Sequence, residues 1–541
     1  MKTPNLCYSI ILLFLSILLP CSILAESITE NGYEGFLQCL HYQNSNTNAS
    51  IFSVLYTPKN SSLYTSTLQS GIQNQRFTLP PFVSKPLVII TPLNYLQVQS
   101  VVSCAKRNDI QIRTRGGGHD YEGLSYMSYY PNPFVVVDLR NFISISVDTK
   151  DRTAWVQAGA RLGQVYYTIA QKSPNFGFPA GLCPTVGVGG HLSGGGEGTL
   201  SRKYGMAADH IIDAKVVNAN GEILDRKSMG EDMFWAIRGG GGASFGIILE
   251  YKINLVYVPS TVTVFTVNRT LEQNATKLVH LWQTIAPKFD RDLFIRIIIR
   301  QTTQEGKITV QAAFNSIYLG RADKLLRIMK QSFPELGLRK EDCKEMRWIE
   351  AALYFSDLPS GSTVNDLPRR DPYPKTYYKA KSDYVVEPLS ETALVGIWKL
   401  FKEPRAELAQ MILAPYGGIM EEIPESEIPF PHRAGNLYQI QHLVYWRPNN
   451  NTKSQLYIDW IRELYRYMTP FVSHSPRASY FNYRDLDLGV NKEDNTSFAE
   501  ASAWGFMYFK NNFYRLARVK AAVDPTNFFR YEQSIPPFES F

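Results

Sequence analysis

The sequence contains no run of five like charges, although its formal net charge is +7. Lysine and arginine are spread along the whole chain instead, which argues against a dedicated nucleic-acid surface. Internal repeats and low-complexity segments are also missing. The chain of 541 residues is 44% hydrophobic and 19% charged, an ordinary globular composition. At roughly 100–200 residues per domain, this length predicts two or three domains.

Long apolar runs are scarce as well. The run Ile10–Leu19 is shorter than the about 20 residues that span a bilayer. With Lys2 before it and Ala25 after it, it is typical of a signal peptide over residues 1–25. We therefore expect a secreted monomer of the apoplast or vacuole, with no membrane partner. Six Asn-x-Ser/Thr sequons agree with secretion: Asn48, Asn60, Asn268, Asn274, Asn450 and Asn495.

Cysteine is rare, with six in the chain, of which two lie in the predicted signal peptide. Cys39, Cys104, Cys183 and Cys343 remain, at spacings that match no zinc site, so no metal is expected. An oxidising compartment permits a disulfide, and the sequence alone leaves three pairings open. We favour Cys39 with Cys104, which would pin the N-terminal segment 26–81 to the first domain. Cys343 is interpreted as a buried structural thiol.

The part from 82 to 257 alternates short apolar runs with glycine-rich turns, which predicts an α+β domain. Its Asn220-Gly221 pair predicts a β-hairpin. The expected strands are 86–91, 134–139, 211–218 and 223–226, and the expected helices are 93–107 and 162–171.

Glycine becomes sparse in the part from 258 to 477. A strand over 293–300 and an amphipathic helix over 322–332 predict a second domain, a sheet backed by helices. The segment 478–541 ends in a helix that stops at Pro525.

Three glycine clusters stand in the first domain. Residues 113–120 read RTRGGGHD, where consecutive glycines can form a phosphate nest that Arg113 or Arg115 would help to neutralise. A lone triple glycine is more often a flexible turn. Residues 187–198 hold seven glycines, and 238–246 a further cluster, so close backbone approach to a large flat cofactor is the better interpretation. The spacing excludes a P-loop and a Rossmann fingerprint.

These stretches carry a family resemblance. RTRGGGHDYEGLSY, CPTVGVGGHLSGGGEG, DMFWAIRGGGG and NYRDLDLG resemble the FAD-linked oxidases of the berberine bridge enzyme family, from about residue 34 to 537. The chain is similar to the cannabinoid-acid synthases of that family. The resemblance implies an α+β, two-domain, vanillyl-alcohol-oxidase-like (PCMH-type) FAD fold. Its substrate domain is an antiparallel sheet covered by helices, and the segment from 478 completes the FAD domain.

The resemblance also implies roles. His119 and Cys183 match the residues bonded to the flavin 8α and C6 carbons, which makes the FAD bicovalent. His191 matches a histidine near flavin N1, where a positive charge or a donor stabilises the reduced anion. Val186 stands at an oxygen gate, where valine resembles the oxidases. Further FAD contacts are expected from Arg115, Gly116, Gly117, Gly118, Gly187, Gly189, Gly190, Gly194, Gly195, Asn482 and Tyr483.

In such enzymes substrate hydride goes to flavin N5, a base assists, and O₂ reoxidises the flavin and releases H₂O₂. Here Gln439 stands where related enzymes carry a glutamate, and glutamine cannot accept a proton. Tyr480 is the best remaining base, with Tyr121 second. Arg296 and Arg447 are expected to polarise a phenol or carbonyl if they reach the pocket, with a solvated strand face or polar loop as the alternative.

The leading function is oxidation of an aromatic plant metabolite, such as a prenylated phenol, with cyclisation or desaturation. A non-redox Diels–Alderase that joins a diene and a chalcone-type dienophile is the main alternative, because a carboxylate base is missing and two arginines are available. A carbohydrate oxidase and an allergen-like binding protein are further alternatives.

Overall fold

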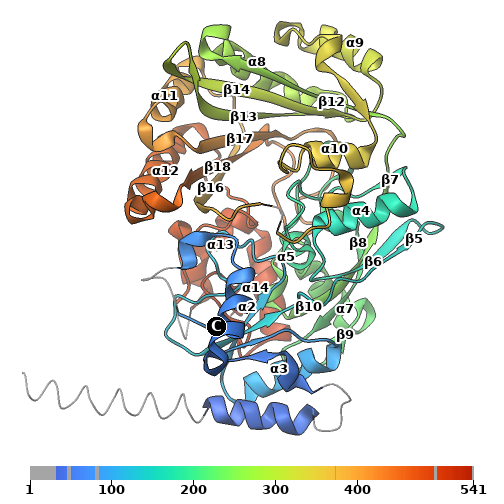
Figure 1. Cartoon of the computed structure of the whole chain (residues 1–541), viewed down its shortest axis with the longest axis vertical. Coiled ribbons are helices and arrows are strands. Elements are labelled where there is room, and N and C mark those ends of the chain that lie inside the picture. The colour runs from blue at the N-terminus through green and yellow to red at the C-terminus, as the bar shows by residue number, and fades with distance from the viewer. Residues whose placement is uncertain (1–31, 45–49, 79–83, 372, 493–495, 539–541) are drawn as a thin grey trace, which may run out of the picture.

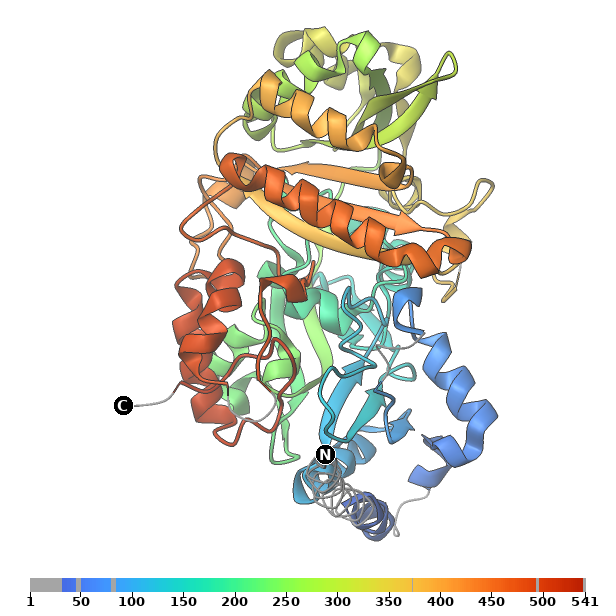
Figure 2. The same cartoon turned by 90° about the vertical axis from the view of Figure 1, so that its left-hand side faces the viewer.

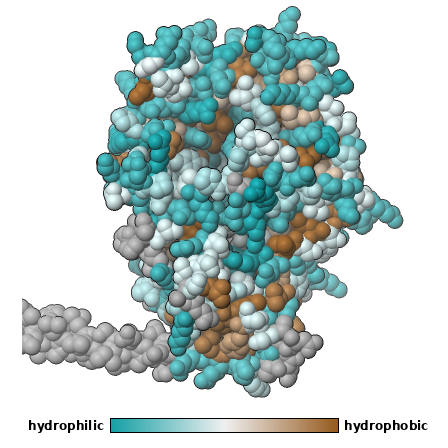
Figure 3. All heavy atoms as spheres, viewed as in Figure 1, coloured by the Kyte–Doolittle hydropathy of each residue, from teal (hydrophilic) through white to brown (hydrophobic). Residues whose placement is uncertain are grey.

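The computed structural model describes residues 32–44, 50–78, 84–371, 373–492 and 496–538. Two lobes lie one above the other (Figures 1 and 2). The predicted signal peptide and the sequons at Asn48 and Asn495 lie outside the described residues. Within them, no helix has the length and apolar character needed to cross a membrane. The face shown in Figure 3 is mostly hydrophilic, with hydrophobic residues in a few small groups.

The lower lobe contains three sheets. A four-stranded sheet has the order β1-β2-β4-β3, in which β2, β4 and β3 run parallel. A five-stranded antiparallel sheet has the order β5-β6-β10-β8-β9, and β11 pairs with β7. The strands are β1 (Leu55–Tyr56), β2 (Val88–Ile90), β3 (Gln111–Arg115), β4 (Phe134–Asp138), β5 (Ile145–Asp148), β6 (Thr153–Gln157), β7 (Phe176–Gly177), β8 (Ile211–Val217), β9 (Ile223–Leu224), β10 (Ile247–Asn254) and β11 (Val256–Tyr257).

Helices pack around these sheets, and the C-terminal pair α13 and α14 joins them. Phe509 on α13 and Phe513 on α14 belong to the same hydrophobic core as the strands of the lower lobe. The helices are α2 (Ser61–Ser70), α3 (Tyr95–Arg107), α4 (Leu162–Lys172), α5 (Val188–Ser193), α6 (Ser201–Tyr204), α7 (Arg226–Ala236), α13 (Phe498–Phe509) and α14 (Asn512–Val523). Residues 32–44 are also helical.

The upper lobe is a seven-stranded antiparallel sheet with the order β15-β12-β14-β13-β17-β18-β16. Helices α8, α11 and α12 cover the face away from the lower lobe, where Figure 2 shows α12 lying across the strands, whereas α10 contacts α4 of the lower lobe. The elements are β12 (Val262–Thr270), α8 (Ala275–Ile285), β13 (Leu293–Gln304), β14 (Lys307–Tyr318), α9 (Ala322–Ser332), β15 (Lys344–Met346), α10 (Trp348–Tyr354), β16 (Tyr377–Val385), α11 (Glu391–Phe401), β17 (Ala409–Pro415), β18 (Tyr438–Trp446) and α12 (Ser454–Met468).

Most predicted elements are confirmed within a few residues. The hairpin at Asn220-Gly221 is formed by β8 and β9, which pair antiparallel. The predicted helix over 322–332 is α9, and the predicted strand over 293–300 is the first part of β13. The disulfide between Cys39 and Cys104 is formed and joins residues 32–44 to α3, with a Cα–Cα distance of 5.6 Å.

Side-chain alternation along the large sheet decides which residues face the lower lobe. On β18, Gln439, Gln441, Leu443 and Tyr445 line a cavity, while the residues between them lie on the helix-covered side. β13 follows the same rule, because Arg296 faces the cavity and both of its neighbours are buried beneath the helices. The period of two that defines a strand therefore gives this sheet one apolar face and one functional face.

Candidate active site

A cavity of about 640 Å³ lies between the two lobes. The large sheet forms one wall, and the three glycine clusters form the opposite wall. This volume is in the range of cofactor and ligand sites, roughly 300–1,000 Å³.

Two of the glycine clusters meet each other in this wall. A Cβ atom on Gly117 would lie 2.4 Å from the backbone nitrogen of Gly187, and a Cβ on Gly187 would lie 2.4 Å from that of Gly117. Any side chain at either position would therefore separate the two loops. Gly190, by contrast, has no atom within 4 Å of its Cβ position and faces open space. Some of these glycines thus serve loop packing, and others leave room for a ligand.

The loop contact brings His119 and Cys183 to one hydroxyl group. Thr185 Oγ1 lies 2.9 Å from His119 Nε2 and 3.3 Å from Cys183 Sγ. Burial lowers the pKa of His119 to about 3, so its ring is neutral. Burial raises the pKa of the Cys183 thiol, while the Thr185 hydrogen bond acts in the opposite direction.

His191 is held in one tautomer. Its Nε2 accepts a hydrogen bond of 2.9 Å from the backbone N–H of Gly181, which places the ring proton on Nδ1. Burial lowers the pKa of His191 to about 4. Of the two options in the sequence prediction, the structure therefore favours a neutral donor over a positive charge.

The glycine-lined wall also contains two ion-paired arginines with free N–H donors. Arg113 pairs with Glu532 at 3.1 Å and Arg484 with Asp120 at 2.9 Å. Arg113 Nε and Nη1 and Arg484 Nη1 are nevertheless buried without a hydrogen bond among the described residues, and both side chains line the cavity. An unpaired buried donor costs about 1–3 kcal/mol, so these atoms call for a hydrogen-bond acceptor on a ligand.

The prediction for the Arg115 side chain was wrong. Arg115 is fully buried, pairs with Asp138 through Nε at 2.8 Å, and donates to the Leu68 carbonyl at 3.0 Å. Arg115 lies on the same face of β3 as Arg113 but does not line the cavity, because Asp138 and the α2 carbonyls of Thr67 and Leu68 bind its guanidinium group. Arg113 is the residue of this pair that faces the cavity.

A neutral donor, free arginine N–H groups and open glycine backbone fit a polar cofactor with a flat ring, such as a flavin dinucleotide. The chain matches the description "FAD binding domain" over residues 86–226 and "Berberine and berberine like" over residues 479–536. It is 51% identical over 530 residues to tetrahydroberberine oxidase from Berberis wilsoniae, which covers 97% of each chain. The chain belongs to the berberine bridge enzyme-like family of plant FAD-binding oxidases.

Solved structures agree with this family. Berberine bridge enzyme-like 28 from Arabidopsis thaliana has a TM-score of 0.88 at 48% identity and covers 94% of this chain and 100% of its own. Phl p 4, a grass pollen allergen with glucose dehydrogenase activity, has a TM-score of 0.87 at 44% identity and covers 93% and 100%. The predicted two-domain α+β FAD fold is therefore confirmed, and the chain is an FAD-dependent oxidoreductase of this family.

In this berberine bridge enzyme-like chain, tyrosines from four segments line the cavity. Tyr121 makes edge contacts with Tyr378 and Tyr483, at ring-centroid distances of 5.6 and 5.8 Å. Tyr480 lies next to Tyr483 at 4.9 Å. Together with Tyr445 they line the cavity, and they give it flat apolar walls with hydroxyl groups at their edges.

The two base candidates, Tyr480 and Tyr121, and the residue Gln439 differ in their hydrogen bonds. The Tyr480 oxygen accepts from the Gly196 N–H at 2.8 Å and from Asn482 Nδ2 at 3.0 Å. Burial raises the pKa of Tyr480, while these donors favour its ionised form. Tyr121 accepts from Gln441 at 2.7 Å, and Gln439 donates to Tyr384 at 2.8 Å. Tyr480 has the environment most suited to a transient negative charge.

The two candidate arginines lie in different surroundings. Arg296 lines the cavity, is 8% exposed, and donates through Nε to Asn315 at 2.8 Å. Arg447 does not reach the cavity, so that prediction was wrong. β18 ends at Trp446, and the Arg447 side chain, 58% exposed, instead pairs with Glu407 at 2.7 Å.

Most of the expected FAD contacts lie in the cavity wall. Gly194 and Gly195 are exceptions, because they lie behind Asn482 and Tyr480, whose side chains approach them closely. The cavity wall includes Gly116, Gly117, Gly118, His119, Cys183, Val186, Gly187, Gly189, Gly190, His191, Asn482 and Tyr483.

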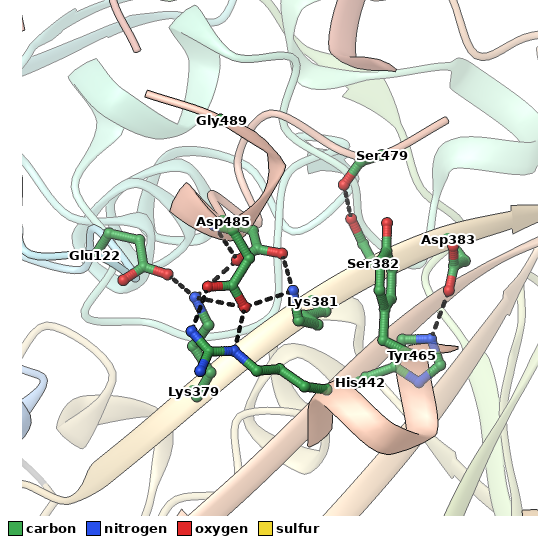
Figure 4. A network of polar contacts seen from close by, with 12 residues as sticks. Glu122, Lys379, Lys381, Ser382, Asp383, His442, Tyr465, Ser479, Asp485 and Gly489 are labelled. Atoms are coloured by element: carbon green, nitrogen blue, oxygen red, sulfur yellow. Dashed lines mark hydrogen bonds and ion pairs between the residues drawn. The ribbon is translucent and has the colours of Figure 1, made fainter. Parts of the chain in front are cut away.

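A buried charge cluster links β16 to the segment that follows Tyr483 (Figure 4). Lys379 and Lys381 project from β16 toward Asp485, with Lys381 Nζ 2.5 Å from its carboxylate, and Lys379 also contacts Glu122. Three of these residues are near neighbours in sequence of a cavity tyrosine: Glu122 follows Tyr121, Lys379 follows Tyr378, and Asp485 lies two residues after Tyr483. The cluster therefore ties together three of the segments that contribute tyrosines to the cavity.

The predictions for residues outside the cavity concern one cysteine and the glycosylation sequons. Cys343 is half-buried rather than buried, because it follows a turn at the sheet edge, and burial raises its pKa to about 11. Asn268 and Asn274 are exposed, and Asn450 is half-buried with its Nδ2 donating to Tyr457. The side chain of Asn60 lies outside the described residues.

The sequence prediction missed Thr185 and Glu197. Thr185 connects His119 with Cys183, and only the folded loops reveal that. Glu197 lines the cavity with both carboxyl oxygens buried and without a hydrogen bond among the described residues. A signal for Glu197 was present, because it is the one acidic residue within a run of seven glycines.

Proposed function

We propose that this chain is a secreted, monomeric FAD-linked oxidase of plant specialised metabolism that acts on an aromatic metabolite such as a prenylated phenol. The observation that carries the proposal is that His119 and Cys183 share one cavity with a tyrosine-rich wall that includes Tyr121, Tyr378 and Tyr483. When bound, FAD supplies two-electron oxidation, with hydride accepted at N5 and O₂ as the final acceptor, which gives H₂O₂. His119 and Cys183 would hold it covalently, and the segments 82–257 and 478–541 would form its domain.

The chain's own residues orient the substrate and move its proton. Tyr121, Tyr378, Tyr445 and Tyr483 offer aromatic faces and edges that exclude water from a flat ring. Arg296 offers a buried cation for a phenol or carbonyl oxygen of that ring. Tyr480 is placed to receive a substrate proton, whereas Gln439 can only donate or accept a hydrogen bond.

Val186 supports oxygen as the acceptor. It lines the cavity, and valine at this gate resembles the oxidases of the family. One variant of Phl p 4 is named a glucose dehydrogenase, and the same variant with an added isoleucine-to-valine change is named a glucose oxidase.

A sugar is the second candidate substrate. The glucose dehydrogenase activity named for Phl p 4 supports it, as do the amide side chains of Gln410, Gln439 and Gln441 in the cavity wall. The cycloaddition alternative is weaker than the sequence indicated, because of its two arginines only Arg296 lines the cavity.

Anaerobic mixing of the purified holoenzyme with three compounds tests whether an aromatic metabolite or a sugar is the substrate. Flavin absorbance is followed with a prenylated phenol, with tetrahydroberberine and with glucose. Rapid bleaching by an aromatic compound supports the proposal. Bleaching by glucose alone would replace it with the sugar oxidase.

A further inference from the structure

Thr185 is the buried residue at which the two candidate attachment side chains meet. It is 2% exposed, and its hydroxyl oxygen lies 2.9 Å from His119 Nε2 and 3.3 Å from Cys183 Sγ. This hydroxyl has no other hydrogen-bond partner among the described residues. Thr185 does not line the cavity, whereas His119 and Cys183 do. It therefore lies behind both side chains and acts on a ligand only through them.

The backbone fixes the turn that carries Thr185. The carbonyls of its neighbours Pro184 and Val186 accept hydrogen bonds of 2.9 and 3.0 Å from the first two residues of α4. The carbonyl oxygen of Thr185 faces the backbone of Gly117, 2.9 Å from the position that a Cβ atom would take there. Because the turn is tied on both sides, the hydroxyl group is held in one place between the imidazole and the sulfur.

The chemistry of the three groups determines how their protons are ordered when Cys183 is reactive. A cysteine acts as a nucleophile in its thiolate form, and a thiolate can only accept a hydrogen bond. The single hydroxyl proton of Thr185 must then point to the sulfur, so the Thr185 oxygen has to accept from His119 Nε2–H. Burial keeps His119 neutral by lowering its pKa to about 3, and a neutral imidazole carries one N–H group. In this order Nδ1 of His119 keeps its lone pair and is the nucleophilic nitrogen.

We propose that Thr185 is a positioning residue for the covalent attachment of FAD, because its hydroxyl group prepares both nucleophiles at once. This inference rests on the double attachment in the proposed function. In each attachment, His119 Nδ1 or Cys183 Sγ forms a bond to a flavin carbon, and the hydrogen on the nucleophile and the hydrogen on that carbon are lost. The two protons and two electrons pass to one O₂, which leaves as H₂O₂. The sulfur bond should depend more strongly on Thr185, because only the sulfur has to ionise.

Other groups around Cys183 do not replace the Thr185 hydroxyl. Burial raises the pKa of the thiol, the Thr185 hydroxyl lowers it, backbone N–H groups lower it less, and the Asp357 carboxylate raises it. Four cavity tyrosines near the sulfur have pKa values that burial raises, so they stay neutral as the thiol titrates: Tyr121, Tyr373, Tyr378 and Tyr445. Removal of the hydroxyl should therefore leave the sulfur protonated at neutral pH.

Alkylation of the denatured holoenzyme measures the sulfur bond without any substrate. Cys183 reacts only where it is not bonded to flavin, and Cys343 is a free thiol that reacts in every sample and serves as the internal standard. The disulfide removes Cys39 and Cys104 from the reaction. Mass spectrometry of the digested protein then shows whether flavin joins the His119 and Cys183 peptides or stays on one of them.

The variants separate the hydroxyl group from the shape of the side chain. Thr185→Val removes the hydroxyl at constant volume, and we expect the alkylated fraction of Cys183 to rise about tenfold or more, with flavin still on the His119 peptide. Thr185→Ser keeps the hydroxyl and should match the wild type. Thr153→Val changes a buried threonine of β6 outside the cavity and should also match it.

A pH series distinguishes ionisation of the sulfur from its displacement. With T185V holoenzyme in air, we expect the missing bond to form about tenfold faster for each pH unit between about pH 7 and pH 9, as the thiolate population rises. A rate that does not change with pH would mean that the sulfur is misplaced, and it would overturn the proposal. T185A carries the same prediction and takes the place of T185V if the valine variant does not fold.

The outcomes for Thr185 and for the proposed function are separate. Full protection of Cys183 in T185V at neutral pH would overturn the role of Thr185 and leave the double attachment intact. Alkylation of Cys183 in the wild type would overturn the double attachment itself, and the inference with it. Neither result involves a substrate, so a failure to oxidise aromatic metabolites is recognised independently, by the absence of flavin bleaching.

Discussion

His119 and Cys183 meet at one hydroxyl group, with Thr185 Oγ1 2.9 Å from the imidazole nitrogen and 3.3 Å from the sulfur. The two side chains come from loops 64 residues apart in sequence (183 minus 119), joined where Gly117 and Gly187 allow backbone contact. Because the two side chains lie close together in the cavity wall, we propose that both bond to FAD in this chain, as the family resemblance implies.

Covalent attachment can be tested by removing each residue. We expect flavin to stay with the acid-precipitated protein in the wild type, in His119→Ala and in Cys183→Ala, and to be released from the double variant. Cys343→Ala is the matched control, because Cys343 lies outside the cavity. Release of all flavin from either single variant would show that one bond, not two, holds the cofactor.

Substitution of Arg296 should weaken catalysis, whereas substitution of Arg447 should have no effect. Arg296→Gln removes a buried cation from the cavity, so we expect kcat/KM to fall about 10–100-fold, the effect of roughly 1.4–2.8 kcal/mol. Arg447→Gln affects only an exposed pair with Glu407 and should leave kcat/KM unchanged. Steady-state kinetics on both variants decide this. Equal losses would mean that Arg447 contributes to the site.

The buried charge cluster should contribute far more to stability than an exposed ion pair. Lys381→Met leaves Asp485 and Asp487 with too little positive charge, and we expect the free energy of unfolding to fall by about 3–5 kcal/mol. Arg447→Met breaks an exposed pair and should cost about 0–1 kcal/mol. Denaturant titration measures both. A fall of less than 1 kcal/mol in the free energy of unfolding of K381M would contradict the stabilising role of the buried cluster.

The same cluster should make the stability of the protein sensitive to acid. Burial alone would raise the pKa of the Asp485 carboxyl, but the ammonium groups of Lys379 and Lys381 hold it below 3.8. The stability that this carboxylate contributes is therefore fully present above its unfolded value of 3.8 and is lost as pH falls through the lowered folded value. Asp485→Asn should be less stable than the wild type at neutral pH, and the difference should shrink below pH 3.8. A constant difference across this range would contradict the account.

The sequence predicted the elements that depend on local patterns. The sequence left open whether Arg296 faces the pocket or solvent, and the structure turns it to the cavity side. It also left open whether Arg447 reaches the pocket or begins a polar loop, because the end of β18 at Trp446 cannot be located from propensity to within one residue. Arg115 failed for a related reason, since its partner Asp138 belongs to another strand.

Contacts between segments far apart in the chain also limited how much of the site could be predicted from the sequence. Thr185 and Glu197 have no local pattern that predicts a partner, and their surroundings arise from segments far apart in the chain. The charge cluster combines Glu122, Lys379 and Asp485, which no spacing rule connects. These contacts follow only from the fold, which brings the segments together.

The central claim is that this chain oxidises an aromatic metabolite with O₂. Product mass and peroxide, measured together after the holoenzyme is given a prenylated phenol alone and then with a chalcone, test it most directly. The account predicts a product lighter by two hydrogens, with one H₂O₂ per product. A product equal to the summed masses of both compounds, formed without oxygen or peroxide, would contradict it and would establish cycloaddition.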